Sequence, residues 1–205
     1  MLTRIVFFLA SQLVFSTRWQ EKYRTLGFPG IEKKSVLIEN AYTHHLEKIS
    51  DGVVAPKIFL WAGRDIPLKN VERLKAAFTE AQKHVPHISL LLLSRVTHEV
   101  VLRHMRNAYA LILPSYSEDS PNLILEGLSF GKPFIATMHN GLHDLIAPFG
   151  IFVDPCDQQA ITDAIIKMCD VGTHRSFEAE IKKFHYMRTY DDIAKEFIQL
   201  ITLPE

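Results

Sequence analysis

Short runs of consecutive apolar residues recur through the middle of this chain, and segments with helical spacing of apolar residues separate them. Strands that helices cover on both faces have this composition, because neither face of the sheet meets water. The pattern therefore predicts an α/β fold with a Rossmann-like, doubly wound parallel sheet. We expect its strands at 57–62, 88–93, 110–113, 134–137 and 150–153, and its helices at 71–83, 99–108, 121–130, 159–171 and 176–186.

The two ends of the chain carry shorter elements. The apolar stretch 5–15 resembles a signal peptide, but it is too short to span a membrane and lacks a small-residue cleavage site. An amphipathic helix is the better interpretation. The elements expected outside the main sheet are a helix at 2–10, a strand at 13–16, a helix at 18–26 capped by Thr17, a strand at 35–39, a loop or short helix at 41–56, and an amphipathic helix at 190–203.

Composition narrows the class of protein. The chain is 47% hydrophobic and 22% charged with a formal net charge of zero, which gives no sign of a nucleic-acid or lipid-binding surface. Cys156 and Cys169 fit no metal-ligand spacing and favour a reducing, cytoplasmic location. His139 and His143 have helical ligand spacing, but Asn140 and Gly141 between them predict a turn that can adopt positive φ. We therefore expect no metal site.

One stretch, residues 110–137, predicts an anion-binding site. The strand at 110–113 is followed by a loop and a helix, with Ser120 as the expected N-cap and Pro121 as the first helical residue. Open α/β sheets bind anions at such a loop, because the helix dipole and the free backbone N–H groups near Ser120 and Asn122 favour negative charge.

Charged residues surround that expected site. Glu118 in the loop and Glu126 in the helix could accept hydrogen bonds from sugar hydroxyls, although acids at the start of a helix are also common for dipole reasons alone. After the strand at 57–62, Gly63 would allow a close approach of the backbone to a ligand. Arg64 and Lys69 could then neutralise a diphosphate without a metal, or simply form a solvated basic turn.

These residues resemble a known family. Glu118 and Glu126 with seven residues between them, then Gly131-Lys132-Pro133, then 140–146 (N-G-L-H-D-L-I), are similar to the signature of group 1, family 4 glycosyltransferases. The turn 63–70 resembles the family's G-R-x-x-x-x-K-G. The chain departs from the pattern in having Gly127 for the usual Ala, Asn140 for the first Gly and Asp144 for the usual Glu. The loop after Glu118 reads D-S-P-N in place of Gly-Phe-Gly, a variant that the family also shows.

The resemblance implies a GT-B fold and retaining transfer of a hexosyl unit from a UDP- or GDP-linked sugar to a hydroxyl acceptor. It implies that Glu126 holds the ribose, that Glu118 contacts the donor sugar, and that Arg64 and Lys69 bind the diphosphate, with no metal or other cofactor. Backbone N–H groups on either side of Pro121, at Ser120 and Asn122, would donate hydrogen bonds to the phosphate. The loop that contains Gly141 would approach the sugar and phosphate.

The resemblance also suggests how the chain is divided. Residues 1–45 would be a remnant of the N-terminal domain with its linker, 46–186 the donor-binding domain, and 187–205 a helix that crosses back to the N-terminal domain. The acceptor-binding domain would then be missing and would be the expected partner, and through it the protein could also lie peripherally at the inner membrane face.

One region departs from the family. About one β-α unit, roughly 20–25 residues, is absent after Leu93, in a region that helps to hold the nucleobase in the family. Arg95 or Thr97 could contact the base, or could only start the next helix.

Two other functions stay open. The chain could be a non-enzymatic nucleotide-sugar-binding module or an inactive subunit that needs a partner domain. The two carboxylates could also suggest a glycoside hydrolase, but such enzymes need no diphosphate clamp.

Overall fold

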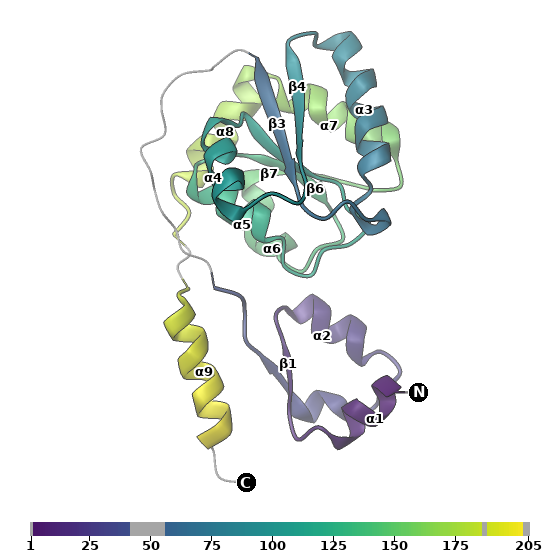
Figure 1. Cartoon of the computed structure of the whole chain (residues 1–205), viewed down its shortest axis with the longest axis vertical. Coiled ribbons are helices and arrows are strands. Elements are labelled where there is room, and N and C mark those ends of the chain that lie inside the picture. Colours follow the sequence, from purple (N-terminus) through teal and green to yellow (C-terminus); the bar gives the residue numbers. More distant parts are fainter. Residues whose placement is uncertain (1, 42–55, 186–187, 203–205) are drawn as a thin grey trace.

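The computed structural model describes residues 2–41, 56–185 and 188–202 of the 205-residue chain. Its larger body is an α/β unit built on a five-stranded, all-parallel sheet (Figure 1). The strands match the apolar runs of the sequence residue for residue, so the predicted doubly wound fold is confirmed. They are β3 (Lys57–Ala62), β4 (Ile88–Leu93), β5 (Ala110–Leu113), β6 (Phe134–Thr137) and β7 (Gly150–Val153).

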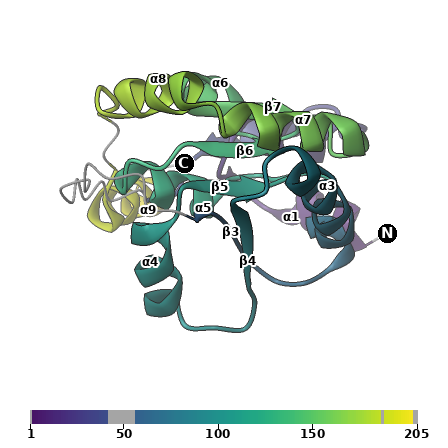
Figure 2. The same ribbon diagram turned by 90° about the horizontal axis from the view of Figure 1, so that it is seen from above.

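Helices cover both faces of this sheet (Figure 2). On one face α3 (Val71–His84) packs against α7 (Gln158–Met168), and on the other lie α4 (His98–Asn107) and α5 (Asn122–Ser129). Because both faces are covered, strand side chains such as Phe59, Leu60, Ile112 and Ile135 are fully buried. The remaining helices of this body are α6 (His143–Ile146) and α8 (Val171–Ile181), with 3₁₀ turns η2 (Pro67–Lys69) and η3 (Ala147–Phe149).

The order of the strands creates a switch point. The spatial order is β4-β3-β5-β6-β7, so the chain steps outward from β3 to β4 and then returns past β3 to β5. The connections that leave β3 and β5 therefore diverge to opposite faces of the sheet. In open α/β sheets, ligands bind outside the carboxyl ends of the strands at such a point.

The N-terminal segment forms a smaller unit. Strands β1 (Leu13–Phe15) and β2 (Ser35–Leu37) pair in parallel, and Leu13, Phe15 and Ile31 make a small core of their own. The predicted cap is confirmed, because Thr17 Oγ1 accepts a hydrogen bond from Gln20 N at 3.0 Å. The helical elements here are α1 (Leu2–Leu9), α2 (Arg18–Thr25) and the 3₁₀ turn η1 (Ile31–Lys34).

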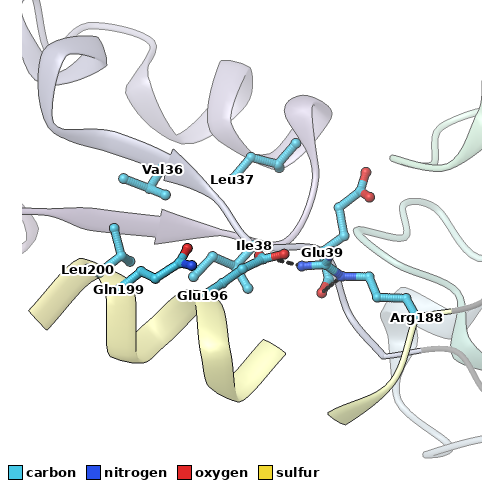
Figure 3. Close-up of a pocket in the computed structure, with 8 residues that line it drawn as sticks. All are labelled: Val36, Leu37, Ile38, Glu39, Arg188, Glu196, Gln199 and Leu200. Atoms are coloured by element: carbon cyan, nitrogen blue, oxygen red, sulfur yellow. Dashed lines mark hydrogen bonds and ion pairs between the residues drawn. The ribbon is translucent and has the colours of Figure 1, made fainter. Parts of the chain in front are cut away.

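Helix α9 (Tyr190–Thr202) lies beside β2 and away from the main sheet (Figure 1). Arg188 links the segment after β2 to α9. It donates to Glu39 O at 2.9 Å and forms an ion pair with Glu196 of α9 at 2.5 Å. A cavity of about 380 Å³ lies between β2 and α9. Figure 3 shows Val36 facing Leu200 and Ile38 facing Gln199 across it. In the part of the chain that the structure describes, every helix is too short or too polar to cross a bilayer.

Several element boundaries differ from the predicted ones; most differ by one residue, but α7 ends at Met168 instead of residue 171 and α8 ends at Ile181 instead of residue 186. Ser120 is not the N-cap of α5, because Pro121 occupies that position and its carbonyl accepts from Ile124 N at 2.9 Å. Helix α8 begins at Val171, five residues earlier than expected, because the Asp170 side chain caps it through Thr173 N at 2.8 Å. Strand β2 ends at Leu37 instead of residue 39. The loop or short helix predicted at 41–56 lies, apart from its two end residues, outside the described residues.

Candidate functional site

The loops that follow β3 and β5 lie side by side at the switch point. Tyr116 N, after β5, donates to Leu68 O, after β3, at 2.9 Å. Asn70 connects these two loops to the loop after β7. Its buried side-chain amide donates to Pro114 O, after β5, at 3.0 Å and to Pro155 O, after β7, at 2.8 Å. Asn70 has φ 57°, in the left-handed region that asparagine tolerates better than most residues. The carboxyl edge of the sheet is therefore held rigidly at this point.

Lys69 and Glu118 meet at that edge. Lys69 Nζ lies 2.6 Å from Glu118 Oε1, although the two residues are 49 positions apart in the sequence. Their side chains are only 18% and 11% exposed. Taking both charges largely out of water is costly, and the attraction between them does little more than repay that cost. Such a pair is therefore better explained by a charged ligand than by stability.

The loop after β6 closes on the same place. Glu118 N donates to His139 O at 2.9 Å, and Gly141 N donates back to Glu118 O at 3.0 Å. A Cβ at Gly141 would overlap Asp119 O and lie 2.8 Å from Thr17 Cβ. The positive φ expected at Asn140 and Gly141 is wrong, because neither residue has one. Glycine is needed there for close approach, and the buried Asn140 side chain braces the turn by donating to Thr137 O at 2.7 Å.

Glu126 faces a partner that the sequence did not indicate. It lies on α5 with 33% of its side chain exposed, and its Oε2 is 3.1 Å from His98 Nε2 at the start of α4. The position of His98 in the sequence could have indicated it. His98 is the first residue of the helix that follows β4, so it lies at the carboxyl edge of the sheet, like the other site residues. Arg73 was missed as well, and it contacts Tyr116 Oη at 3.1 Å and Pro155 O at 2.7 Å.

The other predicted residues line the same edge without direct contact to the two glutamates. Arg64 is exposed in the turn after β3, and Arg95 is exposed after β4 with φ 57°. A Cβ at Gly63 would meet the Trp61 ring at an ordinary 3.5 Å, so the described protein atoms do not require glycine there. Ser120 is half-buried before α5, Pro121 is its buried N-cap, and Asn122 is its exposed first residue.

The opposite edge of the sheet carries a buried polar cluster. His174 stacks on Tyr109 with ring centroids 3.9 Å apart, and its Nε2 lies 3.0 Å from Tyr109 O. The hydrogen bond from His174 holds the pKa of the Glu178 carboxyl below its usual value. Burial raises the pKa of the Cys169 thiol to about 11, so this cysteine is not a reactive thiolate. These residues join the amino ends of the strands to α8, which is a structural role.

Metal ligands do not gather in the described ranges, where no three His, Cys, Asp or Glu side chains form a group that could hold an ion. The chemistry available at the carboxyl edge is that of one lysine, nearby arginines, two carboxylates and the N-terminus of a helix. That set suits a ligand with both an anionic group and hydroxyls.

Comparison with known proteins agrees with this arrangement. Over 59 residues the chain is 37% identical to sucrose-phosphate synthase 4 of Arabidopsis thaliana, a match that covers 28% of this chain and 6% of that protein. Sucrose-phosphate synthase from Thermosynechococcus elongatus has a similar structure, with a TM-score of 0.75 and 18% identity over 97% of this chain and 59% of that one.

Two further solved structures share the fold. S. aureus TarM, in a complex that contains UDP, matches with a TM-score of 0.78 and 11% identity over 98% of this chain and 45% of that one. Anabaena HepE, in complex with UDP and glucose, matches with a TM-score of 0.72 and 14% identity over 98% and 65%. The chain thus spans less than two thirds of each of these proteins. The fold is that of GT-B glycosyltransferases.

The group 1 glycosyl transferase family matches residues 59–170, which include the switch point, Lys69, Glu118 and Glu126. That match covers more than half of the 205 residues. The chain therefore belongs to the family of group 1 glycosyl transferases.

Proposed function

We propose that this chain is the donor-binding half of a retaining, family 4 glycosyltransferase, which moves a hexosyl unit from a nucleoside-diphosphate sugar to a hydroxyl acceptor. The observation that carries the proposal is the contact of Lys69 with Glu118 at the switch point of the sheet. It supports a pocket in which a cation meets the diphosphate beside a carboxylate that meets the sugar. UDP in the TarM and HepE complexes supports the class of donor.

Each charged residue has a role in this proposal. Arg64 and Lys69 bind the diphosphate, and the backbone N–H groups at the start of α5 add donors to it. Glu126 accepts hydrogen bonds from the ribose hydroxyls. The ion pair between Glu118 and Lys69 weakens when the donor binds, and the Glu118 carboxylate then faces the anomeric carbon, where positive charge develops. With two cations at the diphosphate, no divalent metal is required.

The reaction follows from these roles. The bond between the anomeric carbon and the diphosphate oxygen breaks, and its electron pair leaves with the diphosphate, which Arg64 and Lys69 stabilise. The acceptor oxygen bonds to the anomeric carbon on the face that the diphosphate leaves, so the configuration is retained. The acceptor's proton passes to the departing phosphate oxygen, which is the nearest base on that face.

The acceptor site belongs to a second domain in this proposal. Residues 1–45 would be a remnant of that domain with its linker, 187–205 would cross back to pack on that domain, and 46–186 would hold the donor. The enzyme would work in the cytoplasm, either free or held peripherally at the inner membrane face by the acceptor domain.

A second candidate is a nucleotide-sugar-binding module that has no activity without a partner domain. The chain covers 45–66% of the similar solved structures. Adding the separately produced acceptor domain of a related enzyme tests this candidate, because sugar transfer that appears only with that domain identifies this chain as the donor half.

Calorimetry with UDP and GDP tests the donor site. We expect a Kd in the micromolar to millimolar range, and Arg64→Ala should weaken binding at least about tenfold, or about 1.4 kcal/mol. Arg175→Ala is the matched control, since Arg175 is also exposed but lies on α8, beside the structural cluster at the other edge. Absence of heat with either nucleotide at millimolar concentration would refute the donor site.

A further inference from the structure

The connection between β4 and α4 is short and sharply turned. Only residues 94–97 separate the two elements, and Arg95 has φ 57°, which is a costly conformation for a residue with a Cβ. Gly63 N donates to Leu93 O at 3.0 Å, so the end of β4 stays beside the turn after β3. As a result, α4 begins at the carboxyl edge of the sheet, and His98 is its first residue.

His98 contacts the carboxylate that the proposed function assigns to the ribose. Its Nε2 lies 3.1 Å from Glu126 Oε2, with side chains 66% and 33% exposed. A pair this exposed contributes little to stability. Within the described residues, no donor contacts the other oxygen of Glu126, Oε1. One oxygen of the carboxylate is therefore held by His98, and the other is left without a protein donor among the described residues.

We propose that His98 is a positioning residue that fixes Glu126 for the ribose hydroxyls of a nucleoside diphosphate. This inference rests on the proposed function. An ionised carboxylate only accepts hydrogen bonds, so Oε1 can take a donor from ribose while His98 Nε2–H holds Oε2. A carboxylate fixed at one oxygen loses less freedom when the hydroxyls bind, and this preorganisation gives affinity.

The pairing also defines a selectivity. His98 acts only through Glu126, and Glu126 acts only on hydroxyls, so the contribution of His98 should exist for ribonucleotides and vanish for nucleotides without the 2′ and 3′ hydroxyls. A purely structural role of His98 would affect both kinds of nucleotide equally. This difference separates the two explanations without any need for a transfer assay.

The test is calorimetry with UDP and with 2′,3′-dideoxy-UDP on the full chain. His98→Ala should weaken UDP binding by about three- to fivefold and leave dideoxy-UDP binding unchanged. His98→Gln should recover most of the loss, because its side-chain amide also donates. Glu126→Gln should abolish the preference for UDP over dideoxy-UDP. Adding His98→Ala to Glu126→Gln should not weaken UDP binding further. His104→Ala, on the same helix, is the matched control.

The outcomes separate this inference from the proposed function. If His98→Ala weakens both nucleotides alike, or neither, His98 does not position Glu126, while an effect of Arg64→Ala would leave the donor site intact. If the unmodified chain binds no UDP, both proposals fail together. The temperature of unfolding is recorded for each variant, and should His98→Ala fail to fold, His98→Leu, which also lacks a donor, takes its place in the same comparison of the two nucleotides.

Discussion

Removing one charge of the Lys69–Glu118 pair should destabilise the protein, and removing both should cost much less than the sum. Lys69→Met leaves the Glu118 carboxylate 11% exposed without its cation, and Glu118→Gln leaves the Lys69 ammonium 18% exposed without its anion. In the double variant Lys69→Met, Glu118→Gln, no charge is left unpaired.

The exposure of the two side chains sets the magnitude. Removing one partner of a fully buried pair costs about 3–5 kcal/mol, because the remaining charge is desolvated and unpaired. Both side chains here keep some contact with water, so we expect about 2 kcal/mol for each single variant. The double variant should lose about 1–2 kcal/mol, which gives a coupling energy of about 2–3 kcal/mol.

Urea unfolding at pH 7 measures the four free energies of the cycle. The Lys75–Glu72 pair on α3 serves as a control cycle, because it is exposed and the effects of its two single variants should therefore be nearly additive. If the effects of Lys69→Met and Glu118→Gln add within about 0.3 kcal/mol, the two side chains do not share one pocket, and the geometry of the site as argued above is wrong.

Two further predictions concern the packing of α5 on the sheet and the pH dependence of Glu178 on α8. Gly127→Ala should lower the free energy of unfolding by about 1 kcal/mol, because its Cβ would overlap Leu111 Cδ1 and lie 3.0 Å from Leu111 Cγ, an overpacking cost of about 1–3 kcal/mol that exceeds the gain of about 1 kcal/mol in helix propensity. Leu111→Val should relieve the clash, and a higher temperature of unfolding for Gly127→Ala alone would contradict it. Because its pKa is lowered by the hydrogen bond from His174, Glu178 should stabilise the protein above about pH 4.5 and lose this contribution as the pH falls through the lowered value. The gap in urea midpoint between the unmodified chain and Glu178→Gln should therefore narrow from pH 6 to pH 3.5, and a constant gap would exclude the effect.

The strands of the main sheet were predictable because both of their faces are buried. Each apolar run from β3 to β7 is a strand over the predicted residues, since helices cover both faces of the sheet and apolar side chains fill most strand positions. Helix ends were less predictable, because a cap depends on local backbone angles. Ser120 and Pro121 both suit the start of a helix, and the structure places the cap at Pro121.

The site could be predicted only in part, since its residues come from loops whose order in space depends on the sheet. Parallel strands send their following loops to one edge, so the approach of Lys69 to Glu118 could be expected from the sequence. The contact of His98 with Glu126 could not, because it depends on the short β4–α4 connection and on side-chain conformation. The apolar pattern also gave no reason for Asn70 to bind two neighbouring loops.

The most direct measurement of the central claim is the change in backbone amide NMR shifts when UDP is added to the isotope-labelled chain. We expect the largest changes on 63–69, after β3, and on 116–122, after β5, with saturation at one common Kd. Changes centred instead on Tyr109 and His174 at the opposite edge, or on the cavity between β2 and α9, would show that the switch point of the sheet is not the nucleotide site.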